Sequence, residues 1–220
     1  MNKELSQKLF SNYKFLFQDP ETGEIEQLMC FGFECGDGWY NILDSLFSEL
    51  SDNVLSLTLE KEGLKREIEK TQIFIEKPLS ETQNRKRTVY ENQLKQALKR
   101  GDEEEAENVR LNILMFDEAM ERLVQTERGR LNDLKKELDN TDIEIELAKR
   151  NAPRVRQVKE KFGTLNVYGF FPENKQSAIN LAERLSARTC EECGAPGELE
   201  INNHYYQTLC PTHSKKDVKS

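Results

Sequence analysis

The sequence has few histidines and no long apolar run, and each absence limits what the protein can do. Only 2 of the 220 residues are histidine, so few histidines are available to activate a catalytic cysteine. No apolar stretch approaches the roughly 20 residues that a membrane span needs. The N-terminal residues MNKELSQKLF also contain no apolar signal core. We therefore expect a cytoplasmic protein that does not contact a membrane.

The motifs of several common enzyme classes are absent as well. The chain contains no P-loop, no GxGxxG after a strand and no GxSxG. Carboxylates are abundant, since 40 residues are Asp or Glu, and Asp37, Asp44 or Glu160 could act in acid–base catalysis. Most acidic residues in such a chain lie on solvated faces, and GDGW around Asp37 favours a turn or a helix cap. We expect a protein that is not an enzyme.

The overall composition indicates long, solvated helices instead of a thick core. Hydrophobic residues make up 36 % and charged residues 33 % of the chain, and the formal net charge is −8. An acidic chain does not favour non-specific binding to nucleic acid, although it leaves room for a local basic face.

The middle of the chain, residues 51–153, has the pattern of a helical hairpin. Apolar residues recur there at spacings of three and four, from Val54 and Leu57 through Val109 and Ile113 to Ile145, which is typical of a coiled coil. Pro78 should end or kink the first helix. The turn is expected at residues 99–105, with Asp102 as N-cap of the second helix. A single long dimeric coiled coil is the alternative.

Residues 1–50 and 154–220 together predict a small α+β domain. We expect a helix over 1–17, a strand over 28–35, a helix that begins near Trp39, a short helix over 156–162 and a strand over 164–170. The two strands should pair with each other across the hairpin. Trp39, Phe162 and Leu165 are expected to lie in the core, and a further helix should follow Pro172.

Two cysteine-containing motifs near the C-terminus predict a metal site. Cys190 and Cys193 form one ligand pair, and Cys210 and His213 form a second pair after sixteen intervening residues. This spacing is typical of a structural Cys3His zinc site in which a β-hairpin joins the two pairs. Four protein ligands leave no place for a reactive water, so the Zn2+ should be structural, within a zinc ribbon at 189–214.

Three departures from this ligand set stay open. The cysteines could be free buried thiols, because five cysteines in a reducing compartment do not predict disulfides. His204 could replace His213. Cys30 and Cys35 could join a metal site, although we expect them in or beside the core, and the sequence does not determine their role.

Four segments carry a resemblance to a known group of proteins. GDGWYNILDSLFSEL, VKEKFGTLNVYG, LSARTCEECGAPG and LCPTH resemble a group of small proteins encoded by bacteriophages and prophages. The resemblance covers about residues 26–50 and 155–213 and excludes the helical section. It implies a phage origin, a host-cell cytoplasmic location and a zinc knuckle at Cys190, Cys193, Cys210 and His213. It implies no reaction.

These observations lead to one main functional hypothesis and three competing ones. The main hypothesis is a non-catalytic protein that binds a host protein, for example a component of anti-phage defence, and inhibits or redirects it.

Two copies of the chain could also form a homodimer through the hairpin. In the first competing hypothesis, residues 154–171 bind nucleic acid through Arg154, Arg156, Lys159, Lys161 and Tyr168; a buried position for the aromatic residues would argue against it. The second is an oligomer that sequesters a small molecule, and the third is an enzyme with unrecognised carboxylate chemistry.

Overall fold

The computed structural model describes residues 1–77, 80–202 and 205–214, which fall into two compact units. Met1–Thr58 and Glu144–Ser220 form one unit, called here the terminal unit, and Leu59–Ile143 forms the other, called the helical unit. Within the described residues the fold is α+β, with six α-helices and two small antiparallel sheets. The helical insertion predicted from the sequence, residues 51–153, extends beyond the helical unit at both ends.

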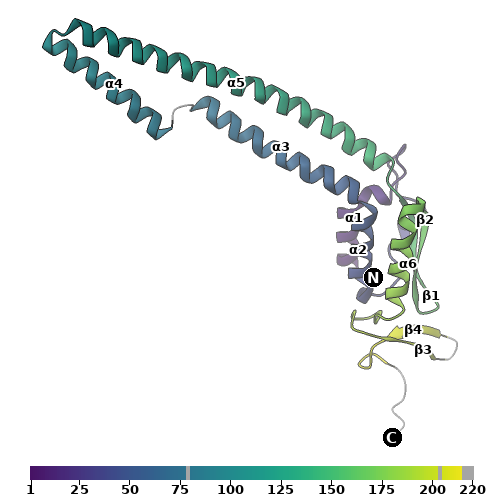
Figure 1. Ribbon diagram of the computed structural model, residues 1–220. Coiled ribbons are helices and arrows are strands. Elements are labelled where there is room, and N and C mark those ends of the chain that lie inside the picture. The colour runs from purple at the N-terminus through teal and green to yellow at the C-terminus, as the bar shows by residue number, and fades with distance from the viewer. Residues whose placement is uncertain (78–79, 203–204, 215–220) are drawn as a thin grey trace. The chain divides into compact units, whose positions relative to one another are not determined.

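The terminal unit contains short helices and all the strands of the described chain. Its α-helices and strands are α1 (Lys3–Asn12), α2 (Tyr40–Leu50), β1 (Arg154–Lys161), β2 (Thr164–Phe170), α6 (Gln176–Ser186), β3 (Glu198–Asn202) and β4 (Tyr205–Leu209). Its 3-10 turns are η1 (Lys14–Leu16), η2 (Met29–Phe31), η3 (Asp37–Trp39) and η4 (Glu173–Lys175). Helix α6 packs against both α2 and β2 (Figure 1).

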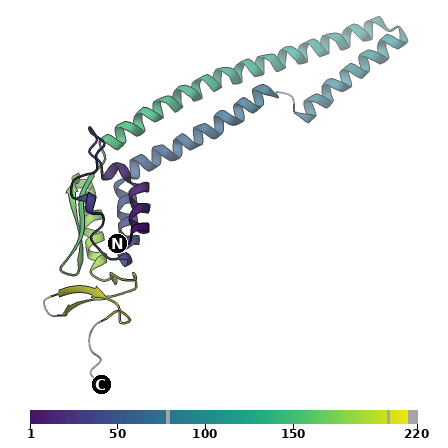
Figure 2. The same cartoon turned by 180° about the vertical axis from the view of Figure 1, so that it is seen from behind.

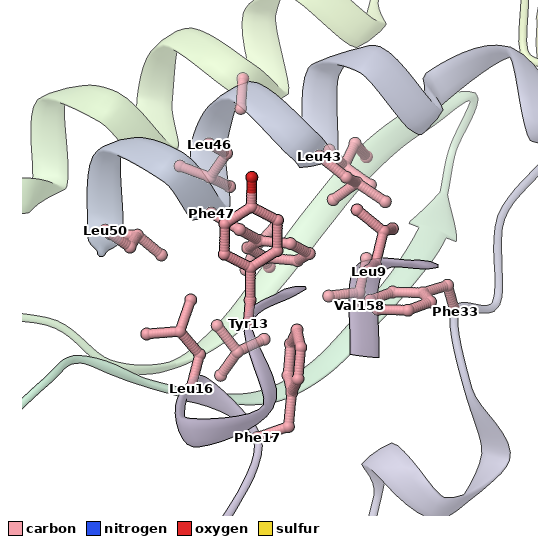
Figure 3. Close-up of a cluster of buried hydrophobic side chains, with 14 of the residues drawn as sticks. Leu9, Tyr13, Leu16, Phe17, Phe33, Leu43, Leu46, Phe47, Leu50 and Val158 are labelled. Carbon is pink, nitrogen blue, oxygen red and sulfur yellow. The ribbon is translucent and has the colours of Figure 1, made fainter. Parts of the chain in front are cut away.

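The core of the terminal unit is built largely from aromatic rings. Side chains from α1, α2, β1 and the turns between them point toward one another in Figure 3. The Phe17 ring lies 5.1 Å from the Phe47 ring and 5.7 Å from the Phe33 ring, edge to face in both pairs. This geometry is the one that aromatic quadrupoles prefer. Trp39 is fully buried, which confirms its predicted place in the core.

The predicted strand over 28–35 is wrong. Met29–Phe31 is a 3-10 turn, and Gly32 follows it with a φ of 78°, which interrupts any extended backbone. Only Glu34 pairs with β1, through an isolated parallel bridge to Lys159. The partner of β2 is therefore β1, in an antiparallel hairpin from Arg154↔Phe170 to Lys161↔Thr164.

The predicted helix over 156–162 is also wrong, because that segment belongs to β1. Val155 and Val158 are both buried although they are three residues apart, a spacing that resembles a helix. The register shifts between Val155 and Gln157, and this bulge inserts the extra residue that brings both valines to one face. Leu165 is buried as expected, whereas Phe162, predicted to lie in the core, is 64 % exposed.

Three helices account for the helical unit, and two of them continue into the terminal unit. They are α3 (Asp52–Glu76), α4 (Glu81–Arg100) and α5 (Glu103–Arg150). At 1.5 Å per residue, the 48 residues of α5 span about 70 Å. Helices α3 and α4 follow one another along α5, as both views show (Figures 1 and 2).

Cross-helix pairs establish that α5 runs antiparallel to α3 and α4. Lys61 pairs with Asp142, and Arg87 pairs with Asp117 at 3.1 Å. Arg100 pairs with Glu105 next to the turn. As the residue number of the partner on α3 or α4 rises, that of its partner on α5 falls, as it must in an antiparallel hairpin.

The ends of α4 are both capped, and the turn after it lies within the predicted residues 99–105. Ser80 and Gln83 form a capping box at the start of α4, and Gly101 closes it with a left-handed φ of 71°. The Asp102 carboxylate accepts a 3.0 Å hydrogen bond from the Glu105 backbone N–H, which confirms Asp102 as the N-cap of α5. Pro78 lies outside the described residues; α3 ends at Glu76.

Candidate metal centre

The two predicted ligand pairs stand on two loops that β3 and β4 hold together. Cys190 and Cys193 follow α6, and Cys210 and His213 follow β4. The antiparallel pairing of Glu198 with Leu209 brings the two loops side by side. The structure therefore places all four predicted residues in one cluster, and their ligand atoms all lie within 4.8 Å of one another.

The distances between these atoms fit a tetrahedral metal ion. Cys193 Sγ lies 3.7 Å from Cys210 Sγ, and His213 Nδ1 lies 3.6 Å from Cys190 Sγ and 3.3 Å from Cys210 Sγ. Around an ion with metal–sulfur bonds of about 2.3 Å and a metal–nitrogen bond of about 2.0 Å, a tetrahedron separates two sulfurs by roughly 3.8 Å and a sulfur and a nitrogen by roughly 3.5 Å. These three distances match a tetrahedral site, and the four residues could hold a metal ion.

Backbone turns give the first loop its geometry. The Gly194 N–H donates to the Cys190 carbonyl at 2.9 Å, and the Cys190 N–H donates to the Ala195 carbonyl at 2.7 Å. Gly194 has a φ of 77°, a backbone conformation that residues with a side chain rarely adopt. A glycine after the second cysteine is thus a requirement of the loop.

The electrostatics of the cluster favour the thiolate form at Cys210 and Cys190, whereas the pKa of Cys193 is raised. Burial alone would disfavour the charged form of Cys210, but the backbone N–H and the ring of His213, together with the neighbouring thiols, lower the pKa of Cys210 to about 6. The pKa of Cys190 is lowered too: burial opposes its ionisation, and backbone N–H groups, first that of Cys210, outweigh it. Thiolates are the form that binds a metal.

The GDGW segment packs directly against the first metal-ligand loop, a contact that the sequence did not reveal. The Gly38 N–H donates to the Glu191 carbonyl at 2.7 Å, and the Gly36 N–H donates to the Glu191 carboxylate at 2.9 Å. The Trp39 indole N–H donates to the Thr189 carbonyl at 2.8 Å. Glu191 is buried, and burial raises the pKa of its carboxyl group.

Two glycines make this contact possible. A Cβ at Gly38 would overlap the Cys190 carbonyl oxygen, and a Cβ at Gly36 would overlap the Glu191 carbonyl oxygen, each at well under 3.0 Å. Both overlaps are with backbone atoms that cannot move aside, so both positions require glycine. The two glycines of GDG indicated a tight turn, but the sequence did not show that the loop of Cys190 and Glu191 packs against them.

The remaining cysteines, Cys30 and Cys35, do not belong to the cluster. Cys30 is exposed, and its Sγ lies 2.9 Å from the Gln27 carbonyl. Cys35 is buried, and burial raises the pKa of its thiol to about 12. His204, the alternative ligand, lies outside the described residues.

The basic residues predicted as a nucleic-acid contact lie on β1, in two different environments. Arg154 pairs with Asp19 at 3.5 Å, and Arg156 pairs with Glu26 at 3.4 Å. Lys159 and Lys161 instead lie over the rings of Tyr168 and Phe162. Of the aromatic residues expected to be buried if this segment does not bind nucleic acid, Tyr168 and Phe170 are exposed, whereas Phe171 packs against the core.

A surface groove separates α2 from α6. It has a volume of about 550 Å³ and is lined mainly by apolar side chains, among them Ile42, Leu46, Leu181 and Leu185. Leu181 and Leu185 are each about half exposed, at 52 % and 47 %.

The chain matches no protein-family model, and neither the curated proteins nor the solved structures contain a match to it. None of the helices in the described part of the chain is long and apolar enough to cross a membrane.

Proposed function

We propose that the protein is a non-catalytic binding protein whose terminal unit is stabilised by one structural Zn2+. Three thiolates and one imidazole nitrogen are the ligands that zinc prefers, and a complete tetrahedral shell has no open position for chemistry. The distances within Cys190, Cys193, Cys210 and His213 support this set, with β3 and β4 as the hairpin of a zinc ribbon. Zinc would hold together two loops that otherwise share little buried apolar surface.

The binding partner proposed is a host protein, which the phage protein inhibits or redirects. The resemblance to bacteriophage and prophage proteins supports the phage origin, and the net charge of −8 suits a basic partner. Helices α3, α4 and α5 would pack as an antiparallel coiled coil and present the contact surface.

The observation that carries this proposal is an apolar patch on α5, defined by Leu111, Leu114 and Met115. These residues are 53 %, 54 % and 61 % exposed, and their spacing places them on one side of the helix. Val109, by contrast, is buried in the helical unit. Contiguous exposed apolar side chains on a charged helix are typical of an interaction surface.

A paired capture experiment tests the proposal. The tagged protein is purified from infected and uninfected bacteria alongside the Leu114→Lys/Met115→Lys variant and a control, Val89→Lys, whose side chain is equally exposed on α4. We expect one host protein to co-purify in stoichiometric amount with the wild type and with the control, and not with the double variant. The same host protein should bind the wild type again when both are purified separately and mixed. Equal capture by all three proteins would exclude the patch. Sedimentation velocity on the same variants tests whether it instead joins two copies of the chain.

A small-molecule role is the second candidate, and the groove between α2 and α6 is the observation that favours it. Its volume of about 550 Å³ lies within the range of small-molecule sites. Native mass spectrometry of the purified protein should then show a bound organic mass that is lost in a Leu46→Lys/Leu181→Lys variant. An unchanged mass would exclude this role.

A further inference from the structure

Four aromatic rings of the terminal unit lie on its surface, outside the Cys/His cluster. Phe162, Tyr168 and Phe170 belong to the β1–β2 hairpin, and Tyr206 belongs to β4; we call these four residues the aromatic face. Phe162 and Phe170 are both more than 60 % exposed. Large aromatic side chains are usually mostly buried, and a group of them exposed on one surface is typical of an interaction site.

The strand register places these rings on the outer side of the hairpin. Leu165 and Val167 of β2 are buried, so Tyr168 and Phe170, which alternate with Val167 and Gly169, point away from the core. Lys159 pairs across the strands with Asn166, and Lys161 pairs with Thr164, which puts both lysines on the same outer side. Alternate residues of a strand are about 7 Å apart.

Phe162 is held at the tip of the hairpin in an unfavourable backbone conformation. Phe162 and Gly163 are the two turn residues, and their φ angles are 55° and 76°. Asparagine or glycine is preferred where both turn residues have positive φ, and a bulky side chain there is an outlier. Such an outlier, combined with an exposed ring, points to a function for this side chain.

The tip is fixed against the second sheet, which brings the Phe162 ring into contact with the Tyr206 ring. The Thr208 hydroxyl donates a 2.6 Å hydrogen bond to the Gly163 carbonyl, and a Cβ at Gly163 would overlap the Leu199 side chain. The Phe162 ring lies 5.5 Å from the Tyr206 ring, edge to face. The turn and β3–β4 lie side by side in both views (Figures 1 and 2).

A cation accompanies three of the rings. Arg156 lies 5.4 Å from the centre of the Phe170 ring, Lys159 lies 5.2 Å from that of Tyr168, and Lys161 lies 5.4 Å from that of Phe162. Glu26 already pairs with Arg156. Among the described residues, no carboxylate lies within ion-pair distance of Lys159 or Lys161. The positive charge available to a ligand is therefore that of two lysines.

We propose that the aromatic face binds single-stranded nucleic acid, with unpaired bases stacked on the rings and phosphates at Lys159 and Lys161. Tyr168 and Phe170 are alternate residues of β2, and Lys159 and Lys161 lie between them and Phe162. Rings and lysines along one hairpin suit bases and phosphates of an extended nucleic-acid strand, and this stacking tolerates any base sequence. Stacking carries most of the affinity, which is compatible with a net charge of −8. This surface and the patch on α5 are independent, so either can fail without the other.

Fluorescence anisotropy with labelled 12-nucleotide oligo(dT) and oligo(U) tests the proposal. Tyr168→Ala and Phe170→Ala should each weaken binding by about tenfold, and Tyr168→Trp should preserve it. The matched control is Tyr90→Ala, because the Tyr90 ring on α4 also carries a lysine, Lys86, at 5.9 Å. Zinc content and Trp39 fluorescence confirm that each variant is folded.

Two further measurements separate stacking from charge. With two phosphates contacted, the logarithm of the binding constant should fall against the logarithm of salt concentration with a slope of about −1.4. An oligonucleotide of the same length that lacks bases should bind at least about tenfold more weakly. Equal binding of the baseless strand, no binding of either oligonucleotide, or unchanged affinity in Tyr168→Ala and Phe170→Ala would overturn the proposal. Loss of the host protein from those two variants, without any oligonucleotide binding, would assign the face to a protein partner instead.

Discussion

The two units of the chain are stabilised in different ways. The terminal unit buries large rings completely, including Trp39, Phe17 and Phe47. The most deeply buried side chains of the helical unit are those of Ala97 and Ala106, and its largest buried side chains are leucines. The helical unit therefore depends on hydrogen bonds within long helices and on surface ion pairs that each contribute little.

This difference predicts two unfolding transitions instead of one. Tertiary contacts between distant segments, together with the proposed zinc ion, stabilise the terminal unit, so losing one of them should affect the whole unit. Contacts in the helical unit repeat along its length, so the loss of one contact should have a local effect.

The largest expected effect is that of metal removal. A chelator or the Cys210→Ser variant should unfold the terminal unit around Trp39, because the Zn2+ binding energy of such sites, about 10 kcal/mol or more, is also folding energy. Trp39 is the only tryptophan of the chain, and its indole donates to Thr189 beside the first ligand pair. Its fluorescence should shift to the red, while the helical circular dichroism of α3–α5 stays. Cys30→Ser, which changes an exposed cysteine outside the cluster, should shift neither signal.

Core truncations should differ between the units. Phe47→Ala should lower the free energy of unfolding of the terminal unit by about 4 kcal/mol, because the ring is fully buried among other rings. Leu134→Ala in the helical unit should cost about 2 kcal/mol, since a leucine removes less buried apolar surface than a phenylalanine and this side chain stays 8 % exposed. Chemical denaturation followed by Trp39 fluorescence and by circular dichroism separates the two. Equal costs would contradict the contrast between the units.

Two glycine-to-alanine substitutions, Gly38→Ala and Gly63→Ala, should change the free energy of unfolding in opposite directions. Gly38→Ala would drive its Cβ into the Cys190 carbonyl oxygen, so it should destabilise the terminal unit by about 2 kcal/mol or more and weaken metal binding. Gly63 lies within α3, and a Cβ added there would meet nothing within 4 Å, so Gly63→Ala should stabilise α3 by about 1 kcal/mol. Thermal unfolding and zinc titration measure both changes. Stabilisation by Gly38→Ala would show that GDGW does not pack on the ligand loop.

The smallest expected effect concerns an ion pair at the start of α3. Lys175 is buried and donates to Asp52 at 2.9 Å and to the Glu49 carbonyl at 2.7 Å. The hydrogen bond from Lys175 holds the pKa of Asp52 below its usual value. The pair therefore stabilises the fold above pH ~4 and is lost as the pH falls through the lower folded-state pKa. Asp52→Asn should cost less than about 1 kcal/mol at neutral pH, and the difference from wild type should vanish in acid when both are followed by thermal unfolding.

The long helices and the Cys/His cluster were predictable because their signals are local. Gly101 and Asp102 marked the turn between α4 and α5, and the spacing within Cys190–Cys193 and Cys210–His213 marked the cluster. Each of these signals acts within a few residues, so the sequence shows it directly.

The strand β1 that pairs with β2 and the residues that pack against the Cys/His cluster were not predictable, for the opposite reason. The bulge between Val155 and Gln157 gave β1 a helix-like spacing of buried residues, and only its pairing with β2 reveals the strand. Gly36 and Gly38 depend on the approach of Glu191 and Cys190, more than 150 positions away in the chain. Phe162 looked like a core residue because its exposure is determined by the turn and by β4.

The central claim is that Cys190, Cys193, Cys210 and His213 hold one zinc ion. The most direct measurement is X-ray absorption at the zinc edge on protein purified without a metal-binding tag, together with the zinc content per chain. We predict one zinc per chain with three sulfur ligands and one nitrogen ligand, retained in Cys30→Ser and lost in Cys210→Ser. A purified, folded chain without zinc, or full zinc content in the Cys210→Ser variant, would contradict the account.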